Sequence, residues 1–407
     1  MKKNDLPILI AGGGIGGTCA ALALARKGRR VQVFEQAAEL KEIGAGIQLA
    51  PNAFHVFRAL GITEAVTQAA AFPEALIVMD SLSGEELTRI PVGPEFRARF
   101  GYPYGLIHRA DLHAILLEAC RKSPLVTLSP SQQVRHFDDL GDRVIVTLSS
   151  TEVVEGAALI GADGLWSTVR AAVVGDGKPR VSGHIAYRAV MGANEAPPAN
   201  RRNAMIIWAG PKTHLVHYPL RRGELFNLVA VFHSNRYEEG WDTYGDVDEL
   251  HQRFAGTCTE VQGILRKIDA WRMWVLCDRE PIKDWSKGRA TLLGDAAHPM
   301  LQYLAQGACM AMEDAVCLAG CLEAADGDCE KAFLDYQQAR YLRTARVQLT
   351  ARLYGEVLHA SGATRDLRNA YLRARTPERA YEDMAWLYDA QNVGDSWNAG
   401  AAAASRA

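Results

Sequence analysis

Three glycines near the N-terminus have the spacing of a loop that binds phosphate groups. Gly12, Gly14 and Gly17 match the pattern G-x-G-x-x-G, and Ile15 lies inside it. In this pattern one glycine permits a tight turn, one lets the backbone approach a pyrophosphate, and one lets a helix pack closely on a strand. A phosphate held there would meet free N–H groups and the positive end of a helix dipole. The motif therefore predicts a dinucleotide-binding loop.

The flanking residues supply the elements that such a loop needs. Residues 6–11 form an apolar run of strand length, and residues 19–26 are rich in helix formers. A second strand over residues 31–35 ends in Glu35, where a carboxylate accepts a hydrogen bond from an adenosine ribose. An acid at this place favours an unphosphorylated ribose. The unit by itself does not distinguish FAD from NAD.

Further along, two acids each follow an expected strand and precede a helix. One pair is Asp163-Gly164 and the other is Gly294-Asp295, and Gly307-Ala308 then open a helix. Arg109 lies near the N-terminus of another expected helix, where the dipole disfavours a cation, so it predicts an anionic partner. Gln48 ends a glycine-rich stretch that could pass close to an extended ligand.

Between residues 181 and 277 the pattern changes to alternating runs, which predict an antiparallel sheet. In the run over residues 213–218, a period of two places His214 and Tyr218 on one face and His217 on the other. Only one of the two histidines can therefore share a pocket with the tyrosine.

Composition bounds the class of protein. The chain has 407 residues, is 48% hydrophobic and 23% charged, and carries a net charge of −2, which predicts about two to three domains and gives no reason to expect nucleic acid. We find no uninterrupted apolar stretch long enough to span a membrane and no signal-like apolar core, so we expect a cytoplasmic protein. The eight cysteines lack metal-binding spacing, so we expect reduced thiols and no metal site.

Taken together, the glycine motif, Asp163-Gly164 and Gly294-Asp295 resemble the single-component FAD-dependent aromatic hydroxylases of the p-hydroxybenzoate hydroxylase type. The resemblance covers nearly the whole chain. It implies an α/β fold: a Rossmann-type FAD-binding domain, an interleaved antiparallel β-sheet substrate domain, and a C-terminal helical extension. We expect the FAD-binding domain over residues 1–75, 102–178 and 281–355, the substrate domain over 76–101 and 179–280, and the extension with its tail over 356–407.

The resemblance also implies roles for the residues named above. The glycines would bind the pyrophosphate, Glu35 the ribose, and Asp295 the ribityl chain of FAD. Asp163-Gly164 and Arg109 would support FAD and the docking nicotinamide. The full set of implied cofactor-binding residues is Gly12, Gly14, Ile15, Gly17, Glu35, Gln48, Arg109, Asp163, Gly164, Asp295, Gly307 and Ala308.

Within this family, residues 44–52, 108–112, 209–219 and 293–308 are most similar to enzymes that hydroxylate 3-hydroxybenzoate para to its hydroxyl. The implied reaction consumes NADH and O2, proceeds through a C4a-hydroperoxyflavin, and gives 2,5-dihydroxybenzoate (gentisate). A phenol has a pKa near 10 and needs a base to ionise at neutral pH, a role suited to histidine. The resemblance assigns this role to His214, with Tyr218 orienting the substrate and Gln302 near the reacting carbon.

Other interpretations remain open at this point. A salicylate-type hydroxylase would use the same cofactor but release carbon dioxide. A flavin-free NAD-dependent dehydrogenase and a non-catalytic flavin-binding protein are the alternatives from other classes. We identify no certain carboxylate-binding residue; Arg188 is a candidate, and His298 is expected to be structural.

The C-terminal part predicts helices. Residues 333–359 have helical apolar spacing, and we expect their arginines, at 340, 343, 346 and 352, to form a solvated basic face. Residues 360–396 would form an extension that covers the substrate domain or pairs with a second subunit of a homodimer. Residues 398–407 are expected to be a disordered tail.

Overall fold

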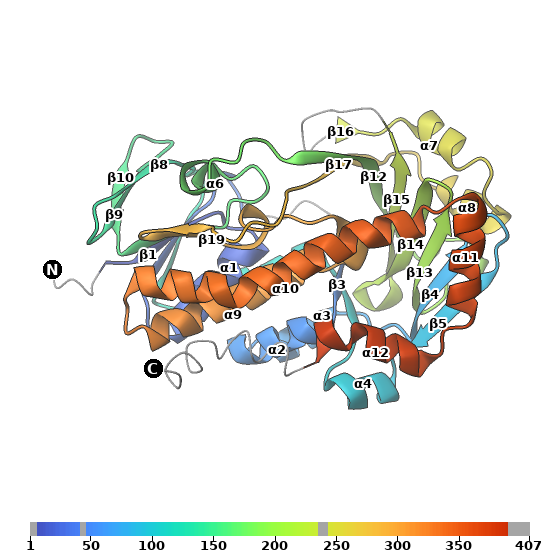
Figure 1. Cartoon of the computed structure of the whole chain (residues 1–407), viewed down its shortest axis with the longest axis horizontal. Helices are drawn as coiled ribbons and strands as arrows, with labels where there is room; N and C mark the ends of the chain where they lie inside the picture. Colours follow the sequence, from blue (N-terminus) through green and yellow to red (C-terminus); the bar gives the residue numbers. More distant parts are fainter. Residues whose placement is uncertain (1–5, 41–45, 235–242, 390–407) are drawn as a thin grey trace.

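The computed structural model of the chain describes residues 6–40, 46–234 and 243–389. The expected tail over residues 398–407 and the start of the glycine-rich stretch, residues 43–45, lie outside the described residues. The molecule is elongated, with one sheet near the N-terminus and a second, larger sheet at the opposite end (Figure 1).

The first sheet has six strands in the order β18-β19-β11-β1-β2-β7. Their bounds are β1 (Ile8–Ala11), β2 (Val31–Phe34), β7 (Val126–Ser129), β11 (Ala158–Gly161), β18 (Ser286–Lys287) and β19 (Ala290–Leu292). All neighbours pair in parallel except β18 and β19. Every residue of β1 is buried, as its continuous apolar run requires in a parallel sheet covered on both faces. The α/β fold predicted for this part is confirmed.

Helices α1 (Ile15–Arg26), α5 (Arg109–Lys122) and α9 (Gly307–Ala324) pack with this sheet in one core. Residues 153–161 form two strands. The chain bends at Ala157, so that β10 (Val153–Gly156) joins a small separate sheet and β11 continues in the six-stranded one. A side chain at Gly156 would meet Leu9, because its ideal Cβ lies 2.4 Å from Leu9 Cγ.

The second sheet has eight strands in the order β16-β17-β12-β15-β14-β13-β4-β5. Their bounds are β4 (Ala75–Asp80), β5 (Glu86–Pro91), β12 (Arg180–Gly192), β13 (Ala204–Gly210), β14 (Thr213–Leu220), β15 (Leu225–His233), β16 (Thr243–Tyr244) and β17 (Arg272–Asp278). The sheet is antiparallel as predicted except between β13 and β4, which pair in parallel. The β4–β5 hairpin comes from an earlier part of the chain.

The two faces of this sheet have different coverings. One face packs against α7 (Val247–Arg253) and α8 (Thr259–Leu265), and the other against the C-terminal half of α10 (Cys329–Leu358). Because side chains alternate along a strand, successive residues of β14 face the α7–α8 side and the α10 side in turn. The face toward α10 is also the face toward the six-stranded sheet (Figure 1).

The remaining elements are short. Two small sheets contain β8 (Val134–Asp139), β9 (Val144–Leu148) and β10, and β3 (Gly46–Leu49) with β6 (Gly105–His108). The other helices are α2 (Pro51–Leu60), α3 (Thr63–Ala69), α4 (Pro94–Phe100), α6 (Thr168–Val173), α11 (Gly362–Arg373) and α12 (Pro377–Tyr388). No helix in the described ranges is both long and apolar enough to cross a lipid bilayer. The proposed domain boundaries stay predictions.

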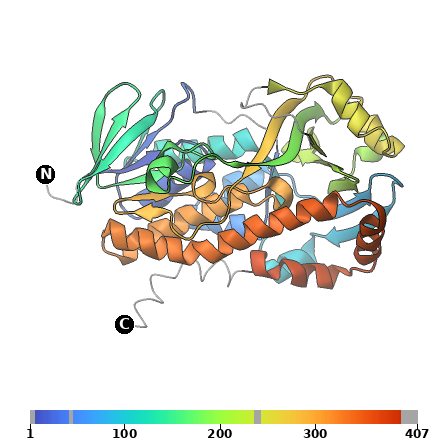
Figure 2. The same ribbon diagram turned by 45° about the horizontal axis from the view of Figure 1, so that its top comes forward.

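Helix α10 spans both halves of the molecule, and α11 and α12 follow it along the larger sheet (Figures 1 and 2). Asp80 at the end of β4 binds Arg365 and Arg368 of α11, which holds the extension on the sheet. Residues 362–388 therefore cover the sheet, one of the two roles expected for them.

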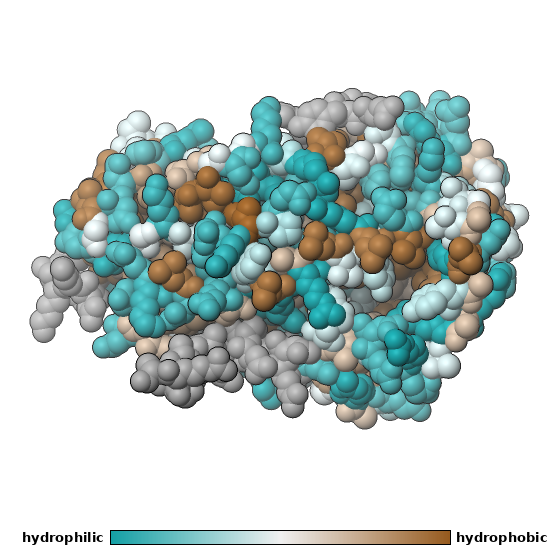
Figure 3. Space-filling model, in the orientation of Figure 1, coloured by the Kyte–Doolittle hydropathy of each residue, from teal (hydrophilic) through white to brown (hydrophobic). Residues whose placement is uncertain are grey.

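The solvated basic face expected on α10 holds only at Arg346, which is exposed, and was wrong for the other three arginines, which are buried or half-buried. Arg340 is fully buried, because it neutralises buried carboxylates of α9, and Arg352 binds Asp278. Leucines are exposed on this helix as well as Arg346: Leu342 and Leu353 are 72% and 60% exposed. Apolar residues are visible along this helix on the molecular surface (Figure 3).

Candidate active site

A cavity of about 410 Å³ lies at the carboxyl ends of β1, β2 and β11. This is the edge of an open parallel sheet where ligands bind. The sequence-predicted residues that line it are Gly12, Gly14, Ile15, Glu35, Arg109, Asp163, Gly164, Asp295, Gly307 and Ala308. We call this space the cavity. It brings together ten residues from six separate stretches of the chain.

The glycine motif leaves no room for side chains. Gly12 has a φ of +102°, and a Cβ there would lie 2.3 Å from the carbonyl oxygen of Ala162. Gly14 is the N-cap of α1 and leaves the first turn of that helix open toward the cavity. Gly17 does not line the cavity; a Cβ on it would lie 1.9 Å from Gly12 O, so it permits close packing of helix and loop.

Glu35 connects the glycine loop with the end of β2. Its Oε2 accepts a hydrogen bond from Gly13 N and its Oε1 one from Ala37 N, both at 2.8 Å. An ionised carboxylate has about four acceptor positions, so each oxygen retains capacity for a further donor such as a ribose hydroxyl. The carboxylate is held in place before any ligand arrives.

Asp163 lines the cavity and is also hydrogen-bonded within its own turn. Its carboxylate accepts hydrogen bonds from Ser167 Oγ at 2.5 Å and from Thr168 N at 2.8 Å, at the start of α6. Burial raises the pKa of Asp163, against the lowering effect of these hydrogen bonds. These hydrogen bonds therefore order the turn after β11. Gly164, the next residue in that turn, has a φ of +77°.

Asp295 and the start of α9 form the opposite wall. Asp295 lies in a 3₁₀ turn, η3 (Gly294–Ala296), and is exposed toward the cavity. Gly307 begins α9, and a Cβ placed on it would lie 3.8 Å from Asp295 Oδ1. Backbone N–H groups at this helix start favour anionic groups of a ligand.

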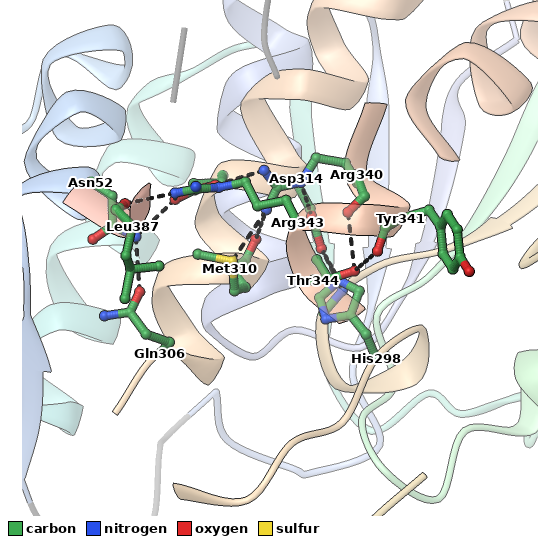
Figure 4. Close-up of polar contacts among 12 residues, drawn as sticks. Asn52, His298, Gln306, Met310, Asp314, Arg340, Tyr341, Arg343, Thr344 and Leu387 are labelled. Carbon is green, nitrogen blue, oxygen red and sulfur yellow. Dashed lines mark hydrogen bonds and ion pairs between the residues drawn. The ribbon is translucent and has the colours of Figure 1, made fainter. Parts of the chain in front are cut away.

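Directly behind this wall lies a buried network of charges (Figure 4). Arg340 binds both Glu313 and Asp314 at 2.6 Å, and all three side chains are fully buried. Asp314 Oδ2 also lies 2.6 Å from His298 Nε2 and accepts from Gly294 N. Through Gly294, the network fixes the turn that presents Asp295.

Asn52 and Arg343 complete the network. Asn52 Nδ2 donates to Glu313 and to Gln306, the N-cap residue of α9. Burial would raise the pKa of Glu313, but Arg343 and Arg340 outweigh it and lower that pKa to about 2. The carboxylate is thus ionised and paired, and it holds the start of α9.

On the larger sheet, His214 and Tyr218 lie on the face of β14 toward α10, and His217 lies on the other face. His217 Nε2 accepts from Trp208 Nε1 at 3.1 Å, a contact away from the cavity. Burial lowers the pKa of both His214 and His217 to about 3. Burial raises the pKa of Tyr218. These groups are neutral at pH 7.

His214 belongs to a group of four histidines, which we call the histidine cluster: His184, His214, His233 and His359. They come from β12, β14, β15 and the end of α10. His359 bridges two of them, with Nε2 2.7 Å from His214 Nδ1 and Nδ1 2.9 Å from His233 Nε2. Ring nitrogens of His184, His233 and His359 lie within 4.8 Å of one another, a grouping that the sequence did not indicate.

Gln302 lies in a second 3₁₀ turn, η4 (Gln302–Leu304), between the cavity and the sheet. Its Oε1 accepts from Arg188 Nη2 at 2.5 Å, and the Arg188 guanidinium lies 5.1 Å from the ring centre of Trp274. Burial lowers the pKa of Arg188 to about 10, so it stays cationic. Within the described ranges, Arg188 has no carboxylate partner.

Gln48 of β3 does not line the cavity. Its Oε1 accepts from Tyr104 Oη at 2.5 Å, while its backbone oxygen lies near Cys309 of α9. Gln48 therefore lies between Tyr104 and the first turn of α9.

Sequence reasoning missed several lining residues. Gln132, Gln133 and Trp166 border the cavity. Trp166 follows Asp163-Gly164 directly and could have been included from its position. The glutamines precede β8 and carried no motif, and the partners of His214 carried no local signal at all.

The chemistry of the lining residues and the position of the cavity both fit FAD. Gly12 lets the backbone approach a pyrophosphate, the starts of α1 and α9 present N–H groups, and Glu35 is positioned for a ribose. A side chain at Gly12 would close this approach.

Comparison with known proteins agrees with this geometry. The family described as FAD binding domain matches residues 5–350. The 3-hydroxybenzoate 6-hydroxylase of Polaromonas naphthalenivorans (strain CJ2) is 48% identical over 396 residues, 97% of each chain. A salicylate hydroxylase solved with its substrate is 25% identical, with a TM-score of 0.82 over 98% of both chains. HpxO of Klebsiella pneumoniae, solved with FAD and uric acid, is 26% identical, with a TM-score of 0.83 over 96% of this chain and 98% of that one. The chain belongs to the FAD-binding-domain family and is a flavoprotein aromatic monooxygenase.

Proposed function

We propose that this protein hydroxylates 3-hydroxybenzoate at the carbon para to its hydroxyl group, consuming NADH and O2 and releasing 2,5-dihydroxybenzoate. The observation that carries the proposal is the 48% identity, over nearly the full length, to a relative named 3-hydroxybenzoate 6-hydroxylase. His214 and Tyr218, on one face of β14, and Gln302, in η4, lie outside the lining of the cavity and would hold the substrate.

FAD would lie in the cavity. The glycine loop would hold its pyrophosphate, Glu35 its ribose, and Asp295 its ribityl chain. Bound FAD supplies the redox chemistry, taking electrons from NADH and activating O2 for attack by the substrate ring. The open start of α9 would stabilise negative charge on the reduced ring system.

His214 would take the proton of the substrate hydroxyl. A phenolate donates electron density to its ring, and the para carbon becomes the nucleophilic position. Nδ1 of His214 faces His359, which leaves Nε2 to face the substrate. Tyr218, on the same face of β14, would orient the ring, and Gln302 would lie near the reacting carbon.

Arg188 would bind the substrate carboxylate. It is a buried cation whose described contacts are an amide oxygen and an aromatic ring. Burying a cation without an anionic partner is costly, so an arriving carboxylate would be favoured. Its hydrogen bond to Gln302 would place that carboxylate beside the reacting carbon.

The nearest rival is a decarboxylating salicylate-type reaction. The 25% identity to a salicylate hydroxylase is much lower than the 48% identity to a 3-hydroxybenzoate hydroxylase, which favours the para reaction. The FAD-binding family match argues against a flavin-free dehydrogenase.

The test uses the purified protein with bound FAD, supplied with NADH, air and either 3-hydroxybenzoate or salicylate, and identifies products by chromatography. We expect one gentisate per NADH from 3-hydroxybenzoate. Catechol from salicylate, or NADH consumption that yields only hydrogen peroxide, would overturn the substrate assignment. NADPH replaces NADH in a parallel assay, and equal rates would contradict the cofactor preference.

A cytoplasmic homodimer remains part of the proposal. All eight cysteines are free, as expected of a reducing compartment. Light scattering of the purified protein measures the oligomeric state, and a monomer would contradict the dimer.

A further inference from the structure

The histidine cluster forms a continuous path from the proposed base to the protein surface. His214 is 2% exposed, and its Nδ1 contacts His359 Nε2 at 2.7 Å. His359 Nδ1 contacts His233 Nε2 at 2.9 Å, and His233, at the end of β15, is only partly buried. Both distances are those of good hydrogen bonds.

The backbone holds the middle ring in place. His359 O accepts from Lys212 N at 3.0 Å, and Lys212 O accepts from His233 N at 3.1 Å. The end of α10 is thereby tied to the turn between β13 and β14 and to the last residue of β15. Since these contacts come from three elements, the alignment of the rings belongs to the fold and not to one flexible side chain.

From this geometry we propose that His214, His359 and His233 form a proton relay, which carries the proton of the substrate hydroxyl to solvent. This inference rests on the proposed function. A neutral imidazole can accept a proton at one nitrogen and donate one from the other. The relay begins with His214, His359 and His233 each protonated at Nδ1, the state in which each ring donates toward the next ring or toward solvent.

The step balances without a co-reactant. The substrate O–H bond breaks and its proton bonds to His214 Nε2, while the Nδ1 proton of His214 passes to His359 Nε2. The Nδ1 proton of His359 passes to His233 Nε2, and that of His233 leaves to water. All three rings end neutral, each with its proton moved from Nδ1 to Nε2. Protonation of the product phenolate in the reverse direction restores the starting state.

Burial explains why a relay serves better than a single base. Burial, followed by the neighbouring histidines, lowers the pKa of His214 and of His359. A proton left on either ring would therefore be a costly buried charge. A coupled shift along the path transfers the proton without storing that charge.

Among the described residues, charged groups face the path at its outer ring, His233, and at its middle ring, His359. Burial lowers the pKa of His233, Glu356 raises it, and Lys212 and Arg253 lower it. Arg368 faces His359. The inner flank is uncharged: Tyr303 bonds His184 Nδ1 at 2.5 Å, and the His184 ring stacks on His233 with centroids 4.2 Å apart.

A metal site is a weaker interpretation of the same cluster. A metal needs a free lone pair from each ring. The hydrogen bonds already engage both nitrogens of His359, Nε2 of His233 and Nδ1 of His184. Metal binding would require these bonds to break.

The experiment mixes FAD-loaded protein with 3-hydroxybenzoate without O2 or NADH. It follows phenolate formation by absorbance and proton release by an indicator dye in a stopped-flow instrument. We expect His359→Gln to slow both signals about tenfold, with unchanged FAD content and unchanged equilibrium binding of 3-hydroxybenzoate. His233→Ala should slow them similarly, and added imidazole should restore the rate, because it can enter at the partly exposed end. His217→Gln, a buried histidine on the opposite face of β14, is the matched control and should keep the wild-type rate.

Wild-type rates in His359→Gln would overturn the relay, and so would failure of imidazole to rescue His233→Ala. Absence of proton release from the wild-type protein on binding would also overturn it. Failure of the proposed function has a separate signature, because the wild-type protein would then form no gentisate from 3-hydroxybenzoate under turnover conditions.

Discussion

The cavity and the histidine cluster, the two halves of the candidate active site, are built from different groups. Around the cavity, the groups that face a ligand are mainly backbone N–H groups at the starts of α1 and α9, with Glu35 and Asp295 at the rim. Around His214, they are side chains from β12, β14, β15 and α10.

The two halves also differ in whether their buried charged groups have partners of opposite charge. Behind the cavity, Glu313 and Asp314 are ionised and each is paired with an arginine. On the sheet, the histidines are neutral, and Arg188 is a cation without a described carboxylate partner. The buried charges behind the cavity are thus paired within the protein, whereas an anionic substrate would pair with Arg188 on the sheet side.

The largest effect should come from closing the backbone approach. Gly12→Ala places a Cβ 2.3 Å from Ala162 O at a φ of +102°, so we expect the purified protein to lose bound FAD. The ratio of flavin to protein absorbance measures this. Gly263→Ala, in open space on α8, is the control and should retain full FAD content. A yellow, active Gly12→Ala protein would contradict the predicted cofactor position.

The next effect concerns the buried charges. Arg340→Met leaves Glu313 and Asp314 buried with one fewer cation, and we expect a loss of about 3–5 kcal/mol in the free energy of unfolding. Denaturant titration measures it. Arg379→Ala removes an exposed arginine that pairs with Glu382 and should cost at most about 1 kcal/mol.

The same network predicts a pH dependence. Glu313 and Asp314 have pKa values lowered to about 2, below the values of about 4 expected in the unfolded chain. Their contribution to stability is therefore present above about pH 4 and is lost as the pH falls toward 2. Arg340→Met should lose stability at a higher pH than the wild-type protein. Identical acid-unfolding curves would show that the pairing does not lower these pKa values.

A smaller effect tests the sheet side through its base. We expect His214→Gln to lower kcat about 10²-fold at neutral pH. The loss should shrink at alkaline pH, because the substrate phenol, with a pKa near 10, then ionises without help. A pH–rate profile measures it, with His217→Gln as the control on the other face of the strand. A variant with full activity at neutral pH would exclude His214 as the base.

The smallest effect concerns the buried cation. Arg188→Gln should raise KM for 3-hydroxybenzoate about tenfold, through loss of one charge-assisted hydrogen bond. Steady-state kinetics with 3-hydroxybenzyl alcohol, which lacks the carboxylate, is the internal comparison and should show little change. An equal change for both substrates would mean that Arg188 has a structural role.

Much of the cavity could be predicted from the sequence because its parts are local. Gly12, Glu35 and Gly307 each act through their own turn or helix start, so a short motif specifies the geometry. The role of the α10 arginines could not be predicted. Arg340 has the same helical spacing as a surface residue, and only the position of α9 beneath it makes it a buried counter-ion.

Local sequence patterns were sufficient to predict the glycine loop, the alternation that separates His214 from His217, and the helices of the C-terminal part. These features depend on residues within a few positions of one another. The side chains that surround His214 could not be predicted, because His184, His233 and His359 come from distant strands and a helix end. The contact between Arg188 and Gln302 also depends on the tertiary fold. Such contacts depend on how two sheets and α10 pack together, and no local pattern encodes that packing.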